Sequence, residues 1–259
     1  GAEIAEAIQT PPAPEQACNA RCYSGSVSHN VKPNYPRYMA WYDGNPPRLW
    51  LTPPEEQAKR YGAAMGGIDA VVGIAREAFD SGDLRWAAEL LDRAIFADPG
   101  HADAKALQAD TFEQLAYGAE NGPWRNAYLA GATELRHGPF GTPATYSPDL
   151  LRALTPEMVF DAIAIRVNGP KAWDERLSIG IELTDLDRSW RLDLHHGVLI
   201  HRESTVEGAD VVLRLPAAGL TSLLAGKLDG ISIEGDQSVI GRLMAVLDEP
   251  DPEFAIVTP

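Results

Sequence analysis

The chain has 259 residues, 45% of them hydrophobic, which is enough apolar material for one large domain or two ordinary ones. Its 37 acidic residues against 22 basic ones give a formal charge of −15, and this field repels phosphate backbones and anionic lipid headgroups. Nucleic acid is therefore not an expected partner. No window approaches about 18 consecutive apolar residues, so no membrane span is predicted.

Residues 1–50 are interrupted by prolines, each of which lacks a backbone donor and fixes φ, so only short helices are expected between them. These prolines are Pro11, Pro12, Pro14, Pro33, Pro36, Pro46 and Pro47. We interpret the region as a wrapping arm rather than part of a core. Its cysteines, Cys18 and Cys22, leave three options open: two ordinary thiols, a local disulfide, or two ligands of a metal.

Residues 51–138 have a regular helical pattern. Thr52 and Glu55 have the spacing of a capping box at a helix start. Apolar residues then recur at helical spacing on both sides of a Ser-Gly-Asp break at 81–83, which predicts two antiparallel helices joined by a short turn. The two stripes are Ile68, Val71, Val72, Ala75, Ala78 and Phe79, then Leu84, Ala87, Ala88, Leu91, Ala94 and Ile95. Their alanines are typical of tetratricopeptide hairpins, and a weaker copy begins near Ala109.

Residues 139–148 contain the glycine and proline typical of a linker, and residues 149–259 are predicted to form a second, α+β domain. A helix is expected to start at Thr155-Pro156-Glu157. Alternation of apolar and polar residues then predicts an antiparallel sheet with one buried and one wetter face, covered by two later helices. The expected strands lie at 177–183, 190–194, 198–200, 211–215 and 231–233.

Two unusual strings occur in the first half of the chain. One is Ser26-Val27-Ser28-His29-Asn30-Val31-Lys32 leading into Trp41-Tyr42-Asp43-Gly44-Asn45-Pro46, and the other runs from Ala119 to Arg136. Both resemble the dimerisation segment of the linear alkylsulfatases of the metallo-β-lactamase superfamily. The order of elements in 149–259 resembles the sterol-carrier-protein-like domain that ends those enzymes, and the closing string 252–259 is similar to their terminus.

The resemblance implies that this chain is the non-catalytic C-terminal portion of an alkylsulfatase that hydrolyses medium-chain alkyl sulfates such as dodecyl sulfate. Residues 1–50 and 51–138 would then be the arm and body of a dimerisation domain, and the partners would be a second copy and a zinc-bearing metallo-β-lactamase-like domain preceding Gly1. Zinc is expected only in that domain, and a periplasmic or secreted location is implied. Two alternatives remain: a free-standing lipid or detergent carrier without hydrolase activity, and a helical protein-interaction scaffold.

Candidate site residues follow from the same reasoning. In the related enzymes the segment carrying His29 lies after the zinc domain, so His29 either reaches the catalytic pocket as a proton donor or forms a hydrogen bond at an interdomain seam. The second domain is expected to hold an alkyl chain or alkyl sulfate between its sheet and helices, unless its apolar side chains close into a solid core. The residues predicted to line that cleft are Ile163, Val167, Leu220, Leu223, Leu224 and Leu243. The six histidines are not spaced as a zinc site, so no metal is predicted in this chain.

Overall fold

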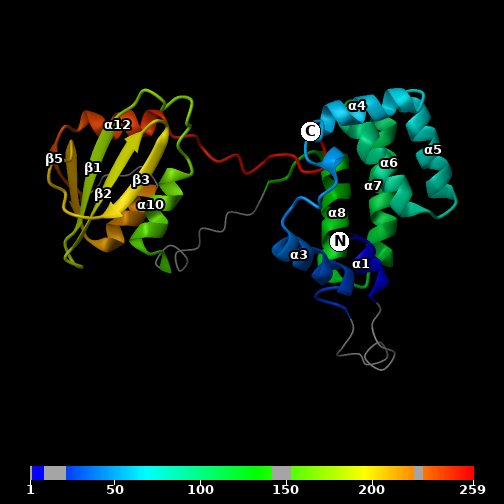
Figure 1. The fold of residues 1–259 in the computed structure, drawn as a ribbon, viewed down its shortest axis with the longest axis horizontal. Coiled ribbons are helices and arrows are strands. Elements are labelled where there is room, and N and C mark those ends of the chain that lie inside the picture. Colours follow the sequence, from blue (N-terminus) through cyan, green and yellow to red (C-terminus); the bar gives the residue numbers. More distant parts are fainter. Residues whose placement is uncertain (1, 9–21, 142–152, 225–229) are drawn as a thin grey trace. The chain divides into compact units, whose positions relative to one another are not determined.

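The structure, a computed structural model, describes residues 2–8, 22–141, 153–224 and 230–259 (Figure 1). It consists of two compact units. One is helical and contains residues 1–141 together with 253–259, and the other is built on a sheet and contains residues 142–252. Most of the predicted linker, from residue 142 onward, lies outside the described residues. No helix in the part of the chain that the structure describes is long and apolar enough to cross a membrane.

Successive helices of the helical unit pack against one another, α5 with α6, α6 with α7 and α7 with α8. Its helices are α1 (Ala2–Ala7), α3 (Val27–Met39), the 3-10 turn η2 (Pro46–Arg48), α4 (Pro54–Ala64), α5 (Ile68–Asp80), α6 (Leu84–Ala97), α7 (Ala102–Gly118) and α8 (Gly122–His137). Helices α5 and α6 lie where the two apolar stripes place them, with the break at 81–83 as their turn. The tetratricopeptide assignment stays a prediction.

The predicted capping box at the start of α4 is wrong. The N-cap is Pro53, whose side chain has no donor or acceptor, and the helix begins at Pro54. Thr52 therefore lies one residue too early to accept from the first-turn amides. Side-chain caps do form at α6, where the Asp83 carboxylate accepts from the amide of Trp86, and at α8, where Asn121 accepts from the amide of Trp124.

Helix α3 departs from the expectation that prolines would allow only short helices in residues 1–50. It runs from Val27 to Met39 with Pro33 and Pro36 inside it. The side chain of Asn34 donates to the Asn30 carbonyl at 2.9 Å, which adds a bond in the region where proline donors are missing. Because most of the helix is exposed, carbonyls left without an amide donor can be hydrated, which reduces the cost of both prolines.

The second unit has a five-stranded sheet in the order β3-β2-β1-β4-β5. Its elements are α10 (Pro156–Ala164), β1 (Leu177–Leu183), β2 (Arg188–His195), β3 (Val198–Glu203), β4 (Val211–Leu215), the turn η3 (Ala217–Gly219), α11 (Leu220–Leu224), β5 (Ser232–Gly235) and α12 (Ser238–Ala245). The predicted β1–β2 hairpin is confirmed, with Ile179 opposite Leu192. The expected antiparallel sheet is not: β1 and β4 are parallel, so the sheet is mixed.

The parallel pair arises from the connection between β3 and β4, residues 204–210. Because β3 lies at one edge, this segment must cross the face of the sheet to place β4 beside β1. It passes directly over Gly180, where an added Cβ would lie 2.6 Å from the Cβ of Val206. The crossover covers the face that was expected to be wetter, and Ser178 and Gly180 are buried. Period-two alternation identifies strands but not their direction, so sequence could not reveal this.

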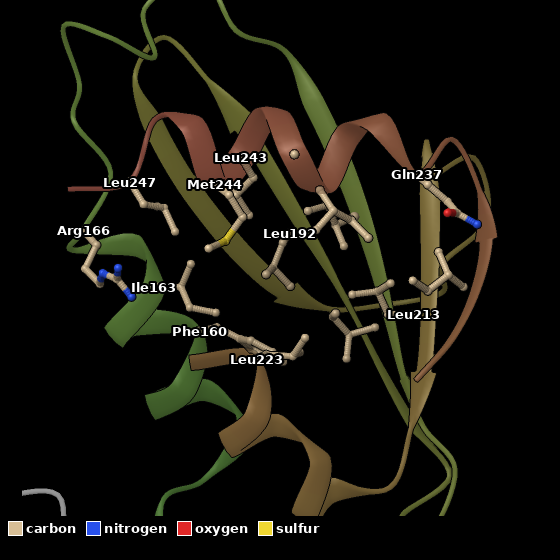
Figure 2. A pocket seen from close by; sticks show the side chains of 15 residues that line it. Phe160, Ile163, Arg166, Leu192, Leu213, Leu223, Gln237, Leu243, Met244 and Leu247 are labelled. Carbon is tan, nitrogen blue, oxygen red and sulfur yellow. The ribbon is translucent and has the colours of Figure 1, made fainter. Parts of the chain in front are cut away.

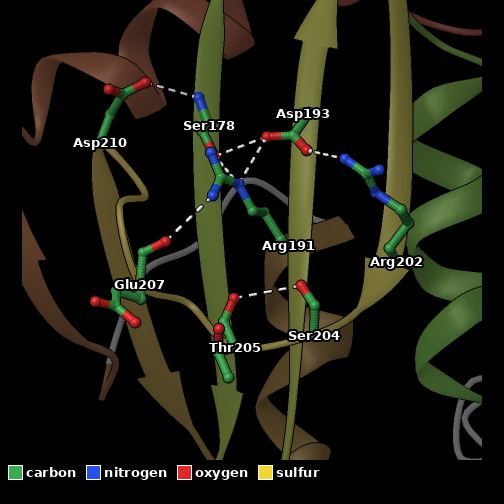
Figure 3. A network of polar contacts seen from close by, with 8 residues as sticks. All are labelled: Ser178, Arg191, Asp193, Arg202, Ser204, Thr205, Glu207 and Asp210. Carbon is green, nitrogen blue, oxygen red and sulfur yellow. Dashed lines mark hydrogen bonds and ion pairs between the residues drawn. The ribbon is translucent and has the colours of Figure 1, made fainter.

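Polar contacts fasten the crossover to the strands beneath it (Figure 3). The Ser178 amide donates to the Asp210 carboxylate at 2.7 Å, and Arg191 donates to the Glu207 carbonyl at 3.2 Å. The Asp193 carboxylate accepts from the Ser178 hydroxyl at 2.8 Å and from two guanidinium groups. This face of the sheet is therefore held by charge-assisted hydrogen bonds, whereas the opposite face is apolar.

The C-terminal segment, residues 253–259, belongs to the helical unit, although sequence analysis places it in the sheet domain. The buried Glu134 of α8 accepts from the amides of Ile256 and Val257 at 2.8 and 2.9 Å. The side chain of Val257 packs on the core of the helical unit. A buried carboxylate needs such donors, and the tail supplies them.

Candidate functional site

An apolar cavity of about 340 Å³ lies inside the sheet unit, between the sheet and helices α10, α11 and α12 (Figure 2). The lining residues are Phe160, Ile163, Arg166, Ile179, Ile181, Leu192, Leu213, Leu223, Ile233, Gln237, Ile240, Gly241, Leu243, Met244 and Leu247. This volume is at the lower end of the range for small-molecule pockets. The apolar face of the sheet and the helices above it therefore leave an open space and do not close into a solid core.

Strand and helix periodicity determine which side chains line the cavity. On β1, every second residue faces the cavity, and Ile179 and Ile181 form part of the cavity floor. The residues that alternate with them face the crossover on the other side of the sheet. Helix α10 is fixed by the Thr155 cap, whose hydroxyl accepts from the amide of Met158, and it presents Phe160 and Ile163 one helical turn apart. An aliphatic chain would therefore meet carbon on the floor and on the walls.

Two of the described lining residues have polar side chains, Arg166 and Gln237, and Figure 2 shows them on opposite sides of the lined space. Arg166 follows α10 and donates to the Asp248 carbonyl at 3.1 Å and to the Glu249 carboxylate at 2.7 Å. Gln237 precedes α12, is exposed, and makes no side-chain cap bond to that helix. The cavity thus has an ion-paired end and a neutral amide end.

Three of the six predicted cleft residues, Ile163, Leu223 and Leu243, line the cavity. Two others do not: Leu220 is buried in the surrounding core, and Val167 packs against that core and bridges to Leu247. The side chain of Leu224 lies outside the described residues. Whether any of these residues binds a substrate stays a prediction.

Sequence reasoning missed most of the cavity because it selected helix positions and left the strands out. Ile179, Ile181, Leu192 and Leu213 were all recognisable as inward-facing by their alternation. Phe160 was recognisable from its position three residues before Ile163. Arg166 had no such signal, because its place follows from how α10 ends.

His29, the candidate site residue outside the predicted cleft, is exposed. Its Nδ1 accepts from the indole Nε1 of Trp124 at 3.0 Å, and the two rings meet edge to face. Because indole can only donate, a neutral imidazole in this contact carries its proton on Nε2. This contact joins the two strings singled out in the sequence. Asn121 also donates to the carbonyl of Cys22, which precedes the first string, at 2.9 Å.

In the described part of the chain, no group of three or more His, Cys, Asp or Glu side chains is placed to hold a metal ion. His195 and His196 lie at the β2–β3 turn, and His201 contacts Asp161 at 2.8 Å. Cys22 forms no disulfide with a described residue, and Cys18 lies outside the described residues, so their pairing stays open.

Comparison with protein families matches residues 1–138 to the alkyl sulfatase dimerisation region and residues 144–259 to the alkyl sulfatase C-terminal region. The chain belongs to the alkyl sulfatase family. A linear primary-alkylsulfatase from Pseudomonas sp. is 41% identical over 99% of this chain and 40% of its own length. An (R)-specific secondary-alkylsulfatase from Pseudomonas sp. is 42% identical over 92% of this chain and 37% of its own length.

Relatives extend beyond bacteria and include solved structures. The alkyl/aryl-sulfatase BDS1 of Saccharomyces cerevisiae is 35% identical over 99% of this chain and 41% of its own length. The structure of the stereoselective inverting sec-alkylsulfatase Pisa1 from Pseudomonas sp. matches with a TM-score of 0.88 and 41% identity over the whole chain and 42% of that protein. This chain therefore spans about 40% of the length of these three curated alkylsulfatases.

Proposed function

We propose that this chain provides two functions of an alkylsulfatase acting on medium-chain alkyl sulfates: its helical unit forms a homodimer contact, and its sheet unit holds the alkyl chain. Hydrolysis of the sulfate ester is assigned to a zinc-bearing metallo-β-lactamase-like region outside residues 1–259. The observation that carries the proposal is the apolar cavity in the unit that matches the family's C-terminal region. We further infer that this unit is sterol-carrier-like in architecture.

The cavity supports the role in chain binding on energetic grounds. Among the lining residues that the structure describes, all are apolar except Arg166 and Gln237. Each buried methylene contributes about 0.8 kcal/mol, so a medium-length alkyl chain gains roughly 5 to 9 kcal/mol before ordering costs. That is sufficient for reversible binding.

The dimerisation role is supported by exposed aromatic side chains in the arm, in the region that matches the family's dimerisation model. Tyr38, Trp41 and Trp50 are 80%, 73% and 92% exposed, and Leu49 and Leu51 are exposed beside them. Aromatic groups concentrated on a surface are typical of the centre of a protein–protein interface. We therefore propose that the exposed side chains of residues 38–51 form the contact between the two copies.

Light scattering at micromolar concentration tests the dimer. The full chain should have the mass of two copies, and the double variant Trp41→Ser, Trp50→Ser should shift it toward one copy. Trp173→Ser is the matched control, since Trp173 is 61% exposed on the sheet unit. A wild-type chain that stays monomeric would contradict the dimer contact.

Binding of the neutral fluorescent probe N-phenyl-1-naphthylamine tests the cavity. Met244→Trp should weaken probe binding, because Met244 lines the cavity at a partly exposed position where an indole fills the space. Ile165→Trp adds the same ring at an exposed position outside the lining and should leave binding unchanged. Equal probe binding by both variants would contradict chain holding.

Sulfate release tests where hydrolysis resides. The chain is incubated with dodecyl sulfate, with and without zinc, and free sulfate is measured. No release is expected under either condition, whereas turnover by this chain alone would contradict the assignment of catalysis to another region.

A further inference from the structure

The two polar ends of the cavity differ in what they can still bind. Resting on the proposed function, in which the cavity holds an alkyl chain, we propose that it selects single-chain amphiphiles with an uncharged hydroxyl headgroup over alkyl sulfates. That class includes the alcohol that hydrolysis of an alkyl sulfate releases together with hydrogen sulfate. The cavity would then accept the product of the reaction more readily than its substrate.

The end at Arg166 is already neutralised. Arg166 is the one charged residue among the described lining residues, and Glu249 accepts from its Nη2 at 2.7 Å while the Asp248 carbonyl accepts from its Nε. A sulfate headgroup that accepted from the remaining guanidinium N–H groups of Arg166 would lie close to the Glu249 carboxylate. Juxtaposed like charges oppose binding, and the chain's net charge of −15 adds to that opposition.

The neighbouring cation is not free to compensate. Lys171 donates to the Asp248 carboxylate at 2.8 Å, and Asn168 donates to the other oxygen of the same carboxylate at 2.7 Å. Arg166 and Lys171 are thus matched by the carboxylates of Glu249 and Asp248. Among the described residues, these ion pairs leave no net positive charge at this end to bind an anion.

The other end is suited to a hydroxyl group. The Gln237 amide offers two N–H donors and a carbonyl acceptor, and an alcohol hydroxyl can both accept from it and donate to it, whereas a sulfate ester can only accept. The N-terminus of α12, which would favour an anion, is already capped by Asp236, whose carboxylate accepts from the Ser238 amide at 2.9 Å. A neutral headgroup at Gln237 with its chain directed into the cavity satisfies both constraints.

Displacement of N-phenyl-1-naphthylamine from the full chain by decan-1-ol, decyl sulfate and decane tests the selection. We expect decanol to displace the probe at about tenfold lower concentration than decyl sulfate. Gln237→Leu should weaken decanol about fivefold, the effect of one neutral hydrogen bond, and leave decane unchanged. Glu249→Gln should strengthen decyl sulfate about tenfold without affecting decanol, because it frees Arg166. Glu207→Gln, the same charge change on the exposed crossover, is the matched control.

Decyl sulfate binding as tightly as decanol or more tightly in the wild-type chain would overturn the selection and leave chain holding intact. Failure of all three ligands to displace the probe would instead overturn the proposed function and the selection with it. An equal gain for decyl sulfate from Glu249→Gln and Glu207→Gln would show that the effect is general charge and would also overturn the assignment to Arg166.

Discussion

Asp193 connects three strands of the sheet unit, because its carboxylate accepts from Ser178 on β1, Arg191 on β2 and Arg202 on β3. Burial alone would raise the pKa of Asp193, but hydrogen bonds from Arg202, Ser178 and Arg191 outweigh burial and hold that pKa below its ordinary value. A lowered folded-state pKa stabilises the fold fully above the ordinary value of about 4, and this contribution is lost as the pH falls through the folded-state pKa.

We therefore expect Asp193→Asn to lower the free energy of unfolding at neutral pH and to flatten its decline at acidic pH. Urea unfolding between pH about 6 and about 2.5, followed by tryptophan fluorescence, to which the fully buried Trp190 of this unit contributes, measures both effects. Asp174→Asn, at an exposed position of the same unit, is the control. Parallel pH curves for Asp193→Asn and wild type would contradict the role given to this carboxylate.

Glu134 plays the corresponding part in the helical unit, where it fixes residues 253–259. Glu134→Ala removes the carboxylate oxygen that accepts from both the Ile256 and Val257 amides and should cost about 1.5–3 kcal/mol, the range for a hydrogen bond to a charged group. The released tail should also become a substrate for carboxypeptidase. Glu77→Ala, an exposed glutamate on α5, should change neither urea stability nor digestion.

At the scale of elements, the crossover over Gly180 determines how β4 joins the sheet. Gly180→Ala would place a methyl group 2.6–2.8 Å from Val206 atoms, so the crossover must shift, at a cost of about 1–3 kcal/mol. Gly241→Ala in α12 meets no atom within 4 Å and should stabilise by about 0.5–1 kcal/mol. Thermal unfolding of both variants separates the packing effect at Gly180 from the helix-propensity effect at Gly241. Equal changes in the unfolding temperature would contradict the close approach of Val206 to Gly180.

The comparison of sequence with structure follows the same division between local and non-local information. Helices α5 and α6 and strands β1 and β2 were predictable because their periods are local properties of the chain. The parallel β1–β4 pair was not, since it depends on a seven-residue path across the sheet, residues 204–210. Helix α3 was not predicted, because its exposure lets water hydrate the carbonyls that the prolines leave without an amide donor, and the bond from Asn34 to the Asn30 carbonyl adds to the helix.

The candidate site divides in the same way. Ile163, Leu223 and Leu243 follow from helical periodicity, and the strand residues of the floor could have been added by the period of two. The ion pair between Arg166 and Glu249 joins residues 83 positions apart, so no local pattern contains it. The cavity's polarity, on which its ligand selection depends, is therefore a property of the fold.

The path of the whole chain predicts that the sheet unit can fold without the rest of the chain, whereas the helical unit needs the C-terminal segment for its full stability. The chain leaves the helical unit after residue 141 and returns to it at residue 253, so the sheet unit is an insertion between the helices and their own C-terminal segment. The sheet unit has a core built from its own elements, including Phe160, Trp190 and Val211, whereas the helical core includes Val257 from the tail.

A fragment of residues 142–252 should therefore fold alone, with a cooperative urea transition. A fragment of residues 1–141 should be less stable than the helical unit of the full chain by about 1.5–3 kcal/mol, the loss expected for Glu134→Ala. Circular dichroism of both fragments in urea measures these differences. Equal stability of residues 1–141 and the full chain's helical unit would show that the tail contributes nothing, while a disordered 142–252 fragment would show that the sheet unit depends on the helices.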